Sequence, residues 1–347
     1  MSFEADHRIR ILDSIELAMI IMKLPLAALL LALARADANW TTCAAPPAGM
    51  LATACDGGAT CCTHPFSVSG WGCCPLGTDA VCCGNGYTCC PAGAECRDSG
   101  DGYSVVTECV APSGAASAGL QICKPGRALA FSTALPNCLV VGDSVSIGYT
   151  PHVAAALADA CAVQHAPLDT SDGGAEETAY GEQCLDYFLA ASDGTATPPD
   201  VVFFNWGLHN LVAPGGAVVP GQSGTTDDYL PHLRNITARL AQLRAAHGTR
   251  LVFGLTSPEM CDADLDATVR ALNAQAQALM DASDVPTVDL HAAVVAACGA
   301  PPQTECLGEA GGGCPHYSSD GYAYIANTTV APAIRAALER PPSRARS

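Results

Sequence analysis

Three short motifs contain residues of the types that perform nucleophilic and acid–base chemistry. The first is Gly142-Asp143-Ser144, which follows the apolar run CLVV and precedes an apparent helix through residues 153–157. The Ser144 hydroxyl can act as a nucleophile there, because backbone N–H groups at a helix start stabilise a developing oxyanion and glycine permits a tight turn. A serine at a helix start is more often an N-cap, so this motif needs support from others.

The other two motifs hold histidine and amide side chains. Residues 206–210 read WGLHN and follow the apolar run VVFFN. Polar side chains directly after a buried strand are expected to face a cleft, where they can donate hydrogen bonds to a substrate oxygen; the alternative is a capped turn with His209 bonded to backbone. His316 lies in CPHYSSDGY, before the last helix. It is a candidate general base, although an isolated loop histidine is usually a surface residue.

The elements that must position these residues are short apolar runs that alternate with long amphipathic ones. Strands are predicted at 138–141, 201–205, 251–255 and 287–290. Helices are predicted at 229–247, 263–281 and 321–338. Apolar strands separated by helices indicate a parallel sheet with helices on both faces, which is an α/β/α sandwich. Ligands bind such sheets beyond the carboxyl ends of the strands, where the first two motifs lie.

The order of the three motifs resembles the SGNH hydrolases, the GDSL esterase family, over roughly residues 136–340. GDSVS at 142–146 is similar to the family's nucleophile block, GLHN at 207–210 to its Gly-x-Asn-Asp block, and His316 to the histidine of its Asp-x-x-His block. Gly181, in TAYGEQCLDYFL, stands at the place of the second-block glycine. The resemblance implies a flavodoxin-like α/β/α fold for residues 136–347 and a serine hydrolase that uses no cofactor and no metal.

The resemblance also implies roles for individual residues. Ser144 would attack an ester carbonyl, and His316 would take its proton and later hand it to the leaving alcohol. The oxyanion would be bound by the Ser144 and Gly181 amides together with the side chain of His209 or Asn210.

The chain departs from the family pattern at two positions. His209 stands where the family has its oxyanion-binding asparagine, so either His209 or the neighbouring Asn210 is the expected donor. Gly313 stands three residues before His316, where the family has its orienting acid. A Ser-His dyad held by a backbone carbonyl remains workable, as does a relocated carboxylate. The carboxylates considered for this orienting role are Glu309, Asp289, Glu305 and Asp320.

A cysteine-rich segment precedes this domain. Twelve of the twenty cysteines lie between Cys43 and Cys109, and eight of the twelve form four adjacent pairs. Adjacent cysteines do not easily bond each other, so each pair is expected to reach in two directions and to tie neighbouring hairpins into a ladder. The spacing resembles the granulin module, which predicts a disulfide-rich β-hairpin stack at residues 39–110, followed by a linker at 111–135. We expect a separable unit that serves either as a spacer or to recognise protein or glycan.

The remaining eight cysteines are also expected to form disulfides, because such a cysteine content indicates an oxidising compartment. A bond from Cys314 to either Cys306 or Cys298 is predicted, because it would fix the loop that carries His316. A zinc role for the cysteine-rich segment is disfavoured, since His64 is its only histidine.

Several features indicate a secreted, extracellular protein. Residues 22–38 have the short basic start, apolar run and small-x-small site of a signal peptide, after an upstream extension within residues 1–38. The apolar run is too short to span a bilayer, so no stable membrane insertion is expected. N-glycosylation sequons begin at Asn39, Asn235 and Asn327. The chain carries 16 basic and 34 acidic residues, and its net charge of -18 disfavours nucleic-acid partners.

These observations predict a secreted serine esterase that hydrolyses short-chain acyl esters. Acetylated polysaccharides are the expected polymers, and lipid esters stay open as substrates. The alternative is a non-catalytic extracellular protein that binds carbohydrate or protein on a decayed hydrolase scaffold. The missing acid at Gly313 favours that alternative, whereas the retention of both Ser144 and His316 favours the enzyme.

Overall fold

The structure is a computed structural model that describes residues 41–43, 54–55, 58–64, 70–99, 106–124, 129–167, 173–189, 198–218, 221–303 and 314–340. The predicted upstream extension and signal peptide at 1–38 lie outside the described residues. So do Glu305, Cys306 and Glu309.

The centre of the catalytic-domain candidate is a five-stranded parallel sheet. Its strands, in spatial order, are β12 (Ala162–Ala166), β11 (Asn137–Val141), β13 (Val201–Phe204), β14 (Arg250–Leu255) and β15 (Thr287–Asp289). In chain order this is 2-1-3-4-5, the flavodoxin-like arrangement, so the direction of winding reverses between β11 and β13. The predicted α/β/α fold is confirmed. The sequence prediction missed β12, whose residues AVQHA include polar side chains and are only partly buried.

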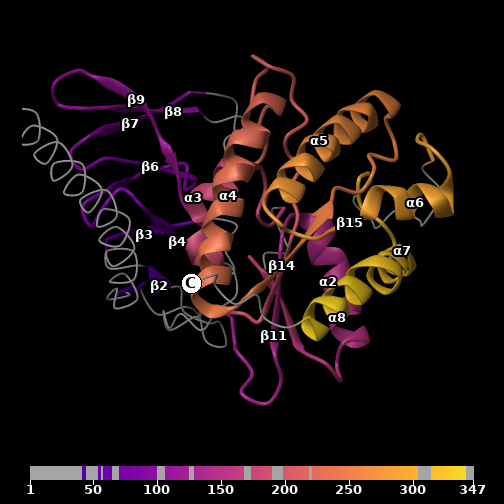
Figure 1. Ribbon diagram of the computed structural model, residues 1–347. Coiled ribbons are helices and arrows are strands. Elements are labelled where there is room, and N and C mark those ends of the chain that lie inside the picture. The colour runs from indigo at the N-terminus through magenta and orange to yellow at the C-terminus, as the bar shows by residue number, and fades with distance from the viewer. Residues whose placement is uncertain are drawn as a thin grey trace, which may run out of the picture. The chain divides into compact units, whose positions relative to one another are not determined.

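Helices cover both faces of this sheet (Figure 1). Their bounds are α2 (Ser144–Ala156), α3 (Thr178–Leu189), α4 (Thr226–His247), α5 (Ala263–Ala282), α6 (Leu290–Cys298), α7 (Ser319–Ile325), the π-helical turn η2 (Ala326–Val330) and α8 (Ala331–Glu339). Side chains of α3, α4 and α5 pack on one face, and side chains of α2, α6, α7, η2 and α8 pack on the other. None of the described helices is both long and apolar enough to cross a membrane.

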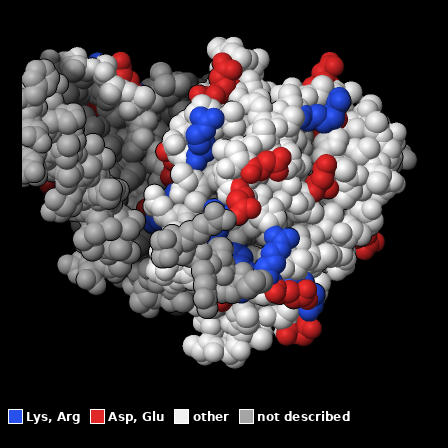
Figure 2. Space-filling view, in the orientation of Figure 1, with Lys and Arg blue, Asp and Glu red and all other residues white. Residues whose placement is uncertain are grey.

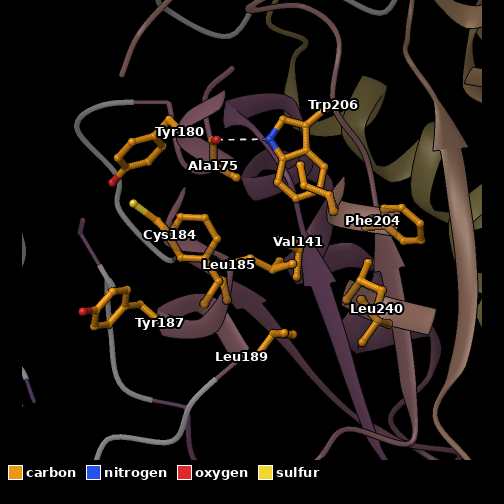
Figure 3. Packing of buried hydrophobic residues seen from close by; sticks show 14 of the residues in the cluster. Val141, Ala175, Tyr180, Cys184, Leu185, Tyr187, Leu189, Phe204, Trp206 and Leu240 are labelled. Carbon is orange, nitrogen blue, oxygen red and sulfur yellow. Dashed lines mark hydrogen bonds between the residues drawn. The ribbon is translucent and has the colours of Figure 1, made fainter. Parts of the chain in front are cut away.

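The strand residues alternate between two separate cores. Val141 and Phe204 point toward α3 and α4, whereas Val140 and Phe203 point toward α2. Figure 3 shows the first of these cores, with Phe204 close to Leu240 of α4. Because both faces of β13 are covered, all four of its side chains are buried, which explains why its sequence VVFF is continuously apolar rather than alternating.

The cysteine-rich segment is built from short antiparallel strands. They are β1 (Thr41–Thr42), β2 (Ala54–Cys55), β3 (Thr60–Thr63), β4 (Trp71–Cys74), β5 (Val81–Cys82), β6 (Thr88–Cys90), β7 (Glu95–Ser99), β8 (Val106–Val110), β9 (Ala116–Ala118) and β10 (Leu120–Gln121). Six disulfides connect them: Cys43–Cys61, Cys55–Cys73, Cys62–Cys82, Cys74–Cys89, Cys83–Cys96 and Cys90–Cys109.

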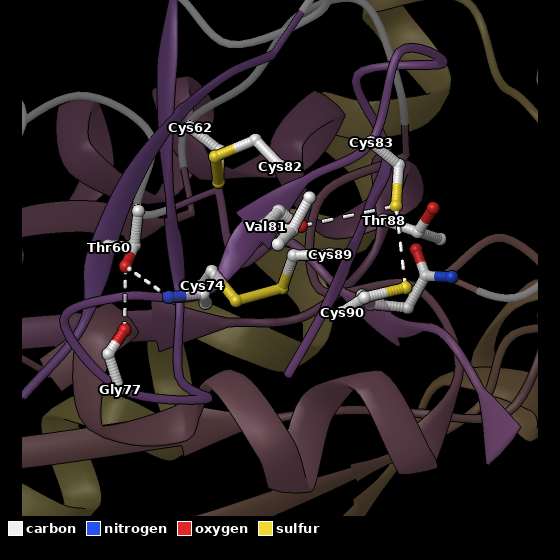
Figure 4. The surroundings of a disulfide bond; sticks show 12 residues. Thr60, Cys62, Cys74, Gly77, Val81, Cys82, Cys83, Thr88, Cys89 and Cys90 are labelled. Carbon is white, nitrogen blue, oxygen red and sulfur yellow. Dashed lines mark hydrogen bonds between the residues drawn. A yellow bond between two sulfur atoms is a disulfide. The ribbon is translucent and has the colours of Figure 1, made fainter. Parts of the chain in front are cut away.

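Each adjacent cysteine pair reaches in two directions, as its geometry predicts. Cys73 bonds back to Cys55, for example, whereas Cys74 bonds forward to Cys89. Figure 4 shows two successive rungs, Cys62–Cys82 and Cys74–Cys89, between neighbouring strands. The buried residues here are mostly the cysteines themselves, so the disulfides supply the core that the few apolar side chains cannot.

Within the segment expected to form a linker, 111–135, the described residues 111–124 instead include two paired strands and a disulfide. Strand β9 pairs with β8, and β10 pairs with β6. Cys123 then exchanges two backbone hydrogen bonds with Cys73 and forms a disulfide with Cys184 of α3. The hairpin turns at Gly114, which has a φ of 82°. Small and turn-prone residues suit a tight hairpin as well as a linker, so the sequence does not distinguish the two; the hairpin forms because a strand edge is available to pair with.

The predicted partner of Cys314 is corrected by the structure. Cys314 bonds Cys261, which follows β14, and not Cys298 or Cys306. A second disulfide, Cys138–Cys161, joins β11 to the residue that precedes β12. Cys298 is disulfide-bonded too, and no cysteine among the described residues is a free thiol. The loop before α7 is therefore anchored to the loop after β14. The disulfide still joins the loop that carries His316 to the rest of the domain, as predicted, although its partner cysteine is a different one.

Basic and acidic side chains are mixed on the surface. On the face shown in Figure 2, Lys and Arg side chains lie singly among Asp and Glu side chains. That face offers no continuous basic surface of the kind that nucleic acids require.

Candidate active site

The nucleophile loop follows β11 and begins α2. Asp143 is the N-cap of α2, and its Oδ1 accepts hydrogen bonds from the amides of Val145 (3.0 Å) and Ser146 (3.3 Å). Gly142 leaves no room for a side chain, since a Cβ there would lie 2.7 Å from Ser146 Oγ. Asp143 therefore performs the capping that a serine often performs, and the Ser144 hydroxyl is left for another partner.

That partner is His316. The Nε2 atom of His316 lies 2.8 Å from Ser144 Oγ, although 172 positions separate the two residues in the chain. The disulfide from Cys314 to Cys261 and the buried ring of Tyr317, whose hydroxyl bonds Pro258 O, flank His316. A serine hydroxyl within hydrogen-bond reach of an imidazole is the arrangement of an activated nucleophile and its general base.

A carboxylate that the sequence reasoning missed interacts with His316. Glu259, in the loop after β14, is only 8% exposed, and burial raises the pKa of its carboxyl while the positive charge of His316 opposes that rise. One of its carboxylate oxygens lies within 4.8 Å of the sulfur atoms of Cys261 and Cys314. Its position in the loop that follows the predicted strand at 251–255 was the available signal, whereas most of the predicted carboxylates lie near His316 in the chain.

The carboxylates that were predicted for the orienting role lie elsewhere or outside the described residues. Asp289 is the N-cap of α6, and its Oδ1 accepts the amide hydrogen bond of Ala292 at 2.8 Å. Asp320 is exposed in the first turn of α7. Glu305 and Glu309 are not described.

Gly181 has a packing role. Its amide donates to Glu177 O at 2.9 Å within α3, so it is not available to an oxyanion. A Cβ at Gly181 would lie 2.6 Å from the indole nitrogen of Trp206, which itself donates to Ala175 O (Figure 3). The glycine thus permits α3 to approach Trp206. The prediction that the Gly181 amide binds the oxyanion is wrong, because that amide is bonded within the helix.

Gly173 and Gly174 approach the nucleophile loop instead. Gly174 forms a β-bridge with Asp143, and the next amide, of Ala175, donates to Gly142 O at 2.9 Å. Both glycines have a positive φ, 87° and 74°, which other residues rarely adopt. A Cβ at Gly173 would lie 3.0 Å from Cε1 of His209, so this turn fits between the loops that follow β11 and β13.

The two predicted side-chain donors have different surroundings. Asn210 is fully buried, where its Oδ1 accepts from the amide of Thr178 (3.1 Å) and its Nδ2 donates to Thr225 O (3.3 Å). Its amide therefore joins the loop to α3 and α4. His209 keeps 23% of its side chain exposed, and only its Nδ1 has a hydrogen-bond partner among the described residues. Of the two side chains, only that of His209 has a ring nitrogen, Nε2, without a hydrogen-bond partner among the described residues.

Buried charges surround His209. The carboxylate of Glu176 lies 3.3 Å from His209 Nδ1 and 3.3 Å from Lys124 Nζ, and the side chains of Glu176 and Lys124 are 1% and 6% exposed. Burial raises the pKa of Glu176 to about 7, against the opposing positive charges of His209 and Lys124. Burial likewise raises the pKa of Asp143, which the charges of His209 and His316 oppose. Asp143 is thus electrostatically coupled to both imidazoles.

The described groups of metal-ligating residue types cannot offer thiolates. They are Cys43, Cys55 and Cys61; Cys83, Cys90 and Cys96; and Glu259, Cys261 and Cys314. Every cysteine in these groups is in a disulfide, so none of the three sets has the deprotonated sulfur ligands that zinc takes.

Comparison with known proteins gives results for both parts of the chain. No curated protein matches it. Among solved structures, a lipase/acylhydrolase from Enterococcus faecalis is 16% identical with a TM-score of 0.43, over 60% of this chain and all of that one. An acetyl xylan esterase is 13% identical with a TM-score of 0.42, over 55% of this chain and 96% of that one. A GDSL-like lipase from Bacteroides thetaiotaomicron is 13% identical with a TM-score of 0.40, over 58% of this chain and 87% of that one.

The cysteine-rich segment matches a family model directly. Residues 60–102 match the model of the granulin family. The matched residues include the central rungs Cys62–Cys82, Cys74–Cys89 and Cys83–Cys96. The resemblance inferred from cysteine spacing is confirmed, and this chain contains a granulin module ahead of its parallel α/β sheet.

Proposed function

We propose that residues 136–347 form a secreted serine esterase of the SGNH type, which hydrolyses short acyl esters through Ser144 and His316. The observation that carries this proposal is the 2.8 Å hydrogen bond between Ser144 Oγ, at the start of α2, and His316 Nε2, before α7. The site also lies where the sheet changes its direction of winding, which is the usual ligand position in such sheets.

The reaction begins when Ser144 Oγ attacks the ester carbonyl carbon and its proton passes to Nε2 of His316. The carbonyl oxygen becomes an oxyanion, bound by the Ser144 amide and the His209 side chain. His316 then protonates the leaving alcohol, and an acyl-serine remains. Water, deprotonated by His316, attacks this acyl group, the acid leaves, and the proton returns to Ser144.

Glu259 is the proposed electrostatic partner of His316. When His316 accepts the serine proton it becomes an imidazolium, and a buried carboxylate whose charge interacts with it stabilises that cation. This assignment replaces the family acid that is missing at Gly313. It is also compatible with a dyad in which the nucleophile and base perform the chemistry by themselves.

Secretion and substrate class belong to the same proposal. The disulfide-rich granulin module suits an oxidising, extracellular setting. Asn235 and Asn327, the described sequon asparagines, are exposed and can be glycosylated. Acetylated polysaccharides are the polymers that such an enzyme would meet outside the cell, and the granulin module would act as a spacer or bind protein or glycan.

Ester hydrolysis tests the proposal. Purified, disulfide-bonded protein should turn over acetyl and other short-chain chromogenic esters faster than long-chain ones. Ser144→Ala and His316→Ala should each remove nearly all turnover, and the double variant should be little worse than either, because members of one catalytic unit are strongly non-additive. A serine-directed phosphonate should label Ser144 in the unmodified protein and fail in His316→Ala.

The competing function is a binding protein on a decayed scaffold. In that case the folded protein would show neither turnover nor phosphonate labelling, and Ser144→Ala would leave polysaccharide binding unchanged. Retention of turnover in Ser144→Ala would contradict the assigned nucleophile while leaving an esterase with another site.

A further inference from the structure

The segment GDSVS contains two serines, and each lies within hydrogen-bond distance of a histidine. Ser144 Oγ lies 2.8 Å from Nε2 of His316. Ser146 Oγ lies 2.6 Å from Nε2 of His165, in β12. The two pairs differ in exposure, because Ser144 is partly exposed whereas Ser146 is 0% and His165 is 4% exposed. An ester can therefore reach Ser144 but not Ser146, and the buried pair must have another role.

The buried pair lies next to the nucleophile loop. His165 pairs with Val140 of β11 in the parallel sheet, one residue before that strand ends. Ser146 belongs to the first turn of α2, and its Oγ donates a hydrogen bond of 2.7 Å to Asp143 O, the carbonyl three residues earlier. The Ser146 hydroxyl thus connects β12 to the residue that directly precedes the nucleophile.

The Ser146 hydroxyl has one hydrogen and two acceptors. Nδ1 of His165 lies 2.8 Å from Pro167 O, which only accepts, so Nδ1 carries a hydrogen. Burial lowers the pKa of His165 to about 4, so the ring is neutral at neutral pH and its Nε2 is an acceptor. The hydroxyl hydrogen of Ser146 is therefore shared between His165 Nε2 and Asp143 O.

The acceptor in the loop, Asp143 O, belongs to the same peptide group as the amide of Ser144. This carbonyl also accepts from the amide of Ile147 at 3.0 Å. The Ser144 amide itself has no hydrogen-bond partner among the described residues, and it is the backbone donor that the proposed esterase uses for its oxyanion. A peptide group is planar, so a bond that holds its carbonyl also fixes the direction of its N–H. The same bond polarises the group and makes the N–H a stronger donor.

From these contacts we propose that Ser146 is a positioning residue of the esterase, whose hydroxyl holds the peptide group between Asp143 and Ser144 while it shares its hydrogen with the buried His165. The inference rests on the proposed esterase function. It adds a residue that acts on the backbone of the nucleophile and does not touch the substrate.

The substitution Ser146→Ala removes this hydroxyl and leaves the Asp143 carbonyl with the Ile147 amide as its donor. We expect kcat for short acyl esters to fall about 10-fold with KM nearly unchanged, a smaller loss than the roughly 10²–10³-fold that follows removal of a direct oxyanion donor. Thr150→Val is the matched control and should keep kcat. The Thr150 hydroxyl is also buried in α2 and also bonds a backbone carbonyl, but that carbonyl is Ser146 O, at 2.6 Å, in a different peptide group.

The substitution His165→Phe separates the two bonds of the Ser146 hydroxyl. It removes the contact between serine and histidine, as Ser146→Ala does, but lets Ser146 donate only to Asp143 O. Both variants lose a buried hydrogen bond, so both should unfold at a lower temperature, and only Ser146→Ala should lose turnover. Equal losses of kcat in the two folded variants would overturn the proposal. If His165→Phe does not fold, the comparison with Thr150→Val decides, and equal kcat in Ser146→Ala and Thr150→Val would refute it.

A readout without turnover tests the peptide group itself. Because a hydrogen bond to the Asp143 carbonyl polarises the peptide group, it changes the NMR chemical shift of the Ser144 nitrogen. That shift should move in one direction in Ser146→Ala, which loses the bond, and in the opposite direction in His165→Phe, which strengthens it. Movement in the same direction, or no movement, would contradict the proposal.

The outcomes also separate this inference from the proposed function. Opposite shifts of the Ser144 nitrogen in a protein that hydrolyses no ester would support the positioning role of Ser146 and overturn the esterase. An active esterase whose kcat survives Ser146→Ala would overturn the positioning role alone. A phosphonate label on Ser146 instead of Ser144 would overturn both, because it would make the buried serine the nucleophile.

Discussion

At the scale of single residues, Glu259 is the feature that bears on how the proposed serine esterase would work without an acid close to His316 in the chain. The chain has Gly313 where such an acid would stand, and the loop after β14 instead supplies a buried carboxylate whose charge interacts with His316. The disulfide Cys261–Cys314 connects the two loops covalently. The carboxylate whose charge interacts with His316 therefore lies in the loop after β14, and not three residues before His316 as in the family pattern.

The substitution Glu259→Gln is expected to lower kcat by about 10- to 100-fold with little change in KM, because the carboxylate would act mainly on the imidazolium that forms during the reaction. Asp289→Asn is the matched control. Asp289 was also a candidate acid, but it caps α6, and asparagine caps a helix about as well as aspartate. Steady-state kinetics of both variants decide between the two carboxylates. Equal losses in both would remove Glu259 from its assigned role.

The contact between α3 and the loop after β13 shows how closely neighbouring elements approach the site. Gly181 of α3 leaves space for the indole of Trp206, whose nitrogen bonds Ala175 O beside the nucleophile loop. Any side chain at Gly181 would push α3 away from Trp206. The packing of this one helix thus helps to keep residues 173–175 against Asp143.

We expect Gly181→Ala to destabilise the protein by about 1–3 kcal/mol, because a Cβ 2.6 Å from the indole overpacks the contact. The usual gain of roughly 0.5–1 kcal/mol for alanine over glycine in a helix should not compensate. Gly84, around which a Cβ would meet nothing within 4 Å, provides the control Gly84→Ala. Chemical unfolding at equilibrium measures both. A neutral or stabilising Gly181→Ala would contradict the packing role.

The granulin module and the sheet domain belong to one compact unit at the scale of the whole molecule. Cys123 pairs with Cys73 in the module and bonds Cys184 in α3, and buried cysteines of the module join the same hydrophobic core as α3. Lys124, the next residue, pairs with Glu176 in the candidate site. The module is therefore joined to the esterase candidate and is not the separable unit that the sequence suggested.

Replacing both Cys123 and Cys184 by alanine should lower the free energy of unfolding by about 2–5 kcal/mol, because this bond closes a long loop. It should also lower the rate of ester hydrolysis, because the Cys123–Cys184 bond fixes the backbone next to Lys124, which pairs with Glu176 in the candidate site. The double replacement of Cys62 and Cys82, a bond within the module, is the control and should affect the module's stability more than turnover. Kinetics and unfolding measured on both variants test the coupling. Identical turnover in the two would show that the module does not influence the site.

The sequence by itself determined the features that depend on local pattern. Apolar runs predicted β11, β13 and β14, because a strand covered on both faces must be apolar throughout, and the run after Pro286 predicted β15. Adjacent cysteines predicted the two-directional ladder, because vicinal cysteines do not easily bond each other. Ser144 and His316 could be proposed as a pair since each occupies a recognisable place, after the first strand and before the last helix.

Only the tertiary structure decided which distant loops meet. Glu259 and Cys261, in the loop after β14, come together with Cys314, in the loop before α7, although 53 positions separate the two cysteines in the chain. The choice of His209 over Asn210 depends on the burial of the Asn210 amide between α3 and α4. Residues 111–124 became strands and a disulfide anchor rather than a linker, because an open strand edge and Cys184 were within reach. Such long-range contacts depend on packing and register, which no local pattern of residues encodes.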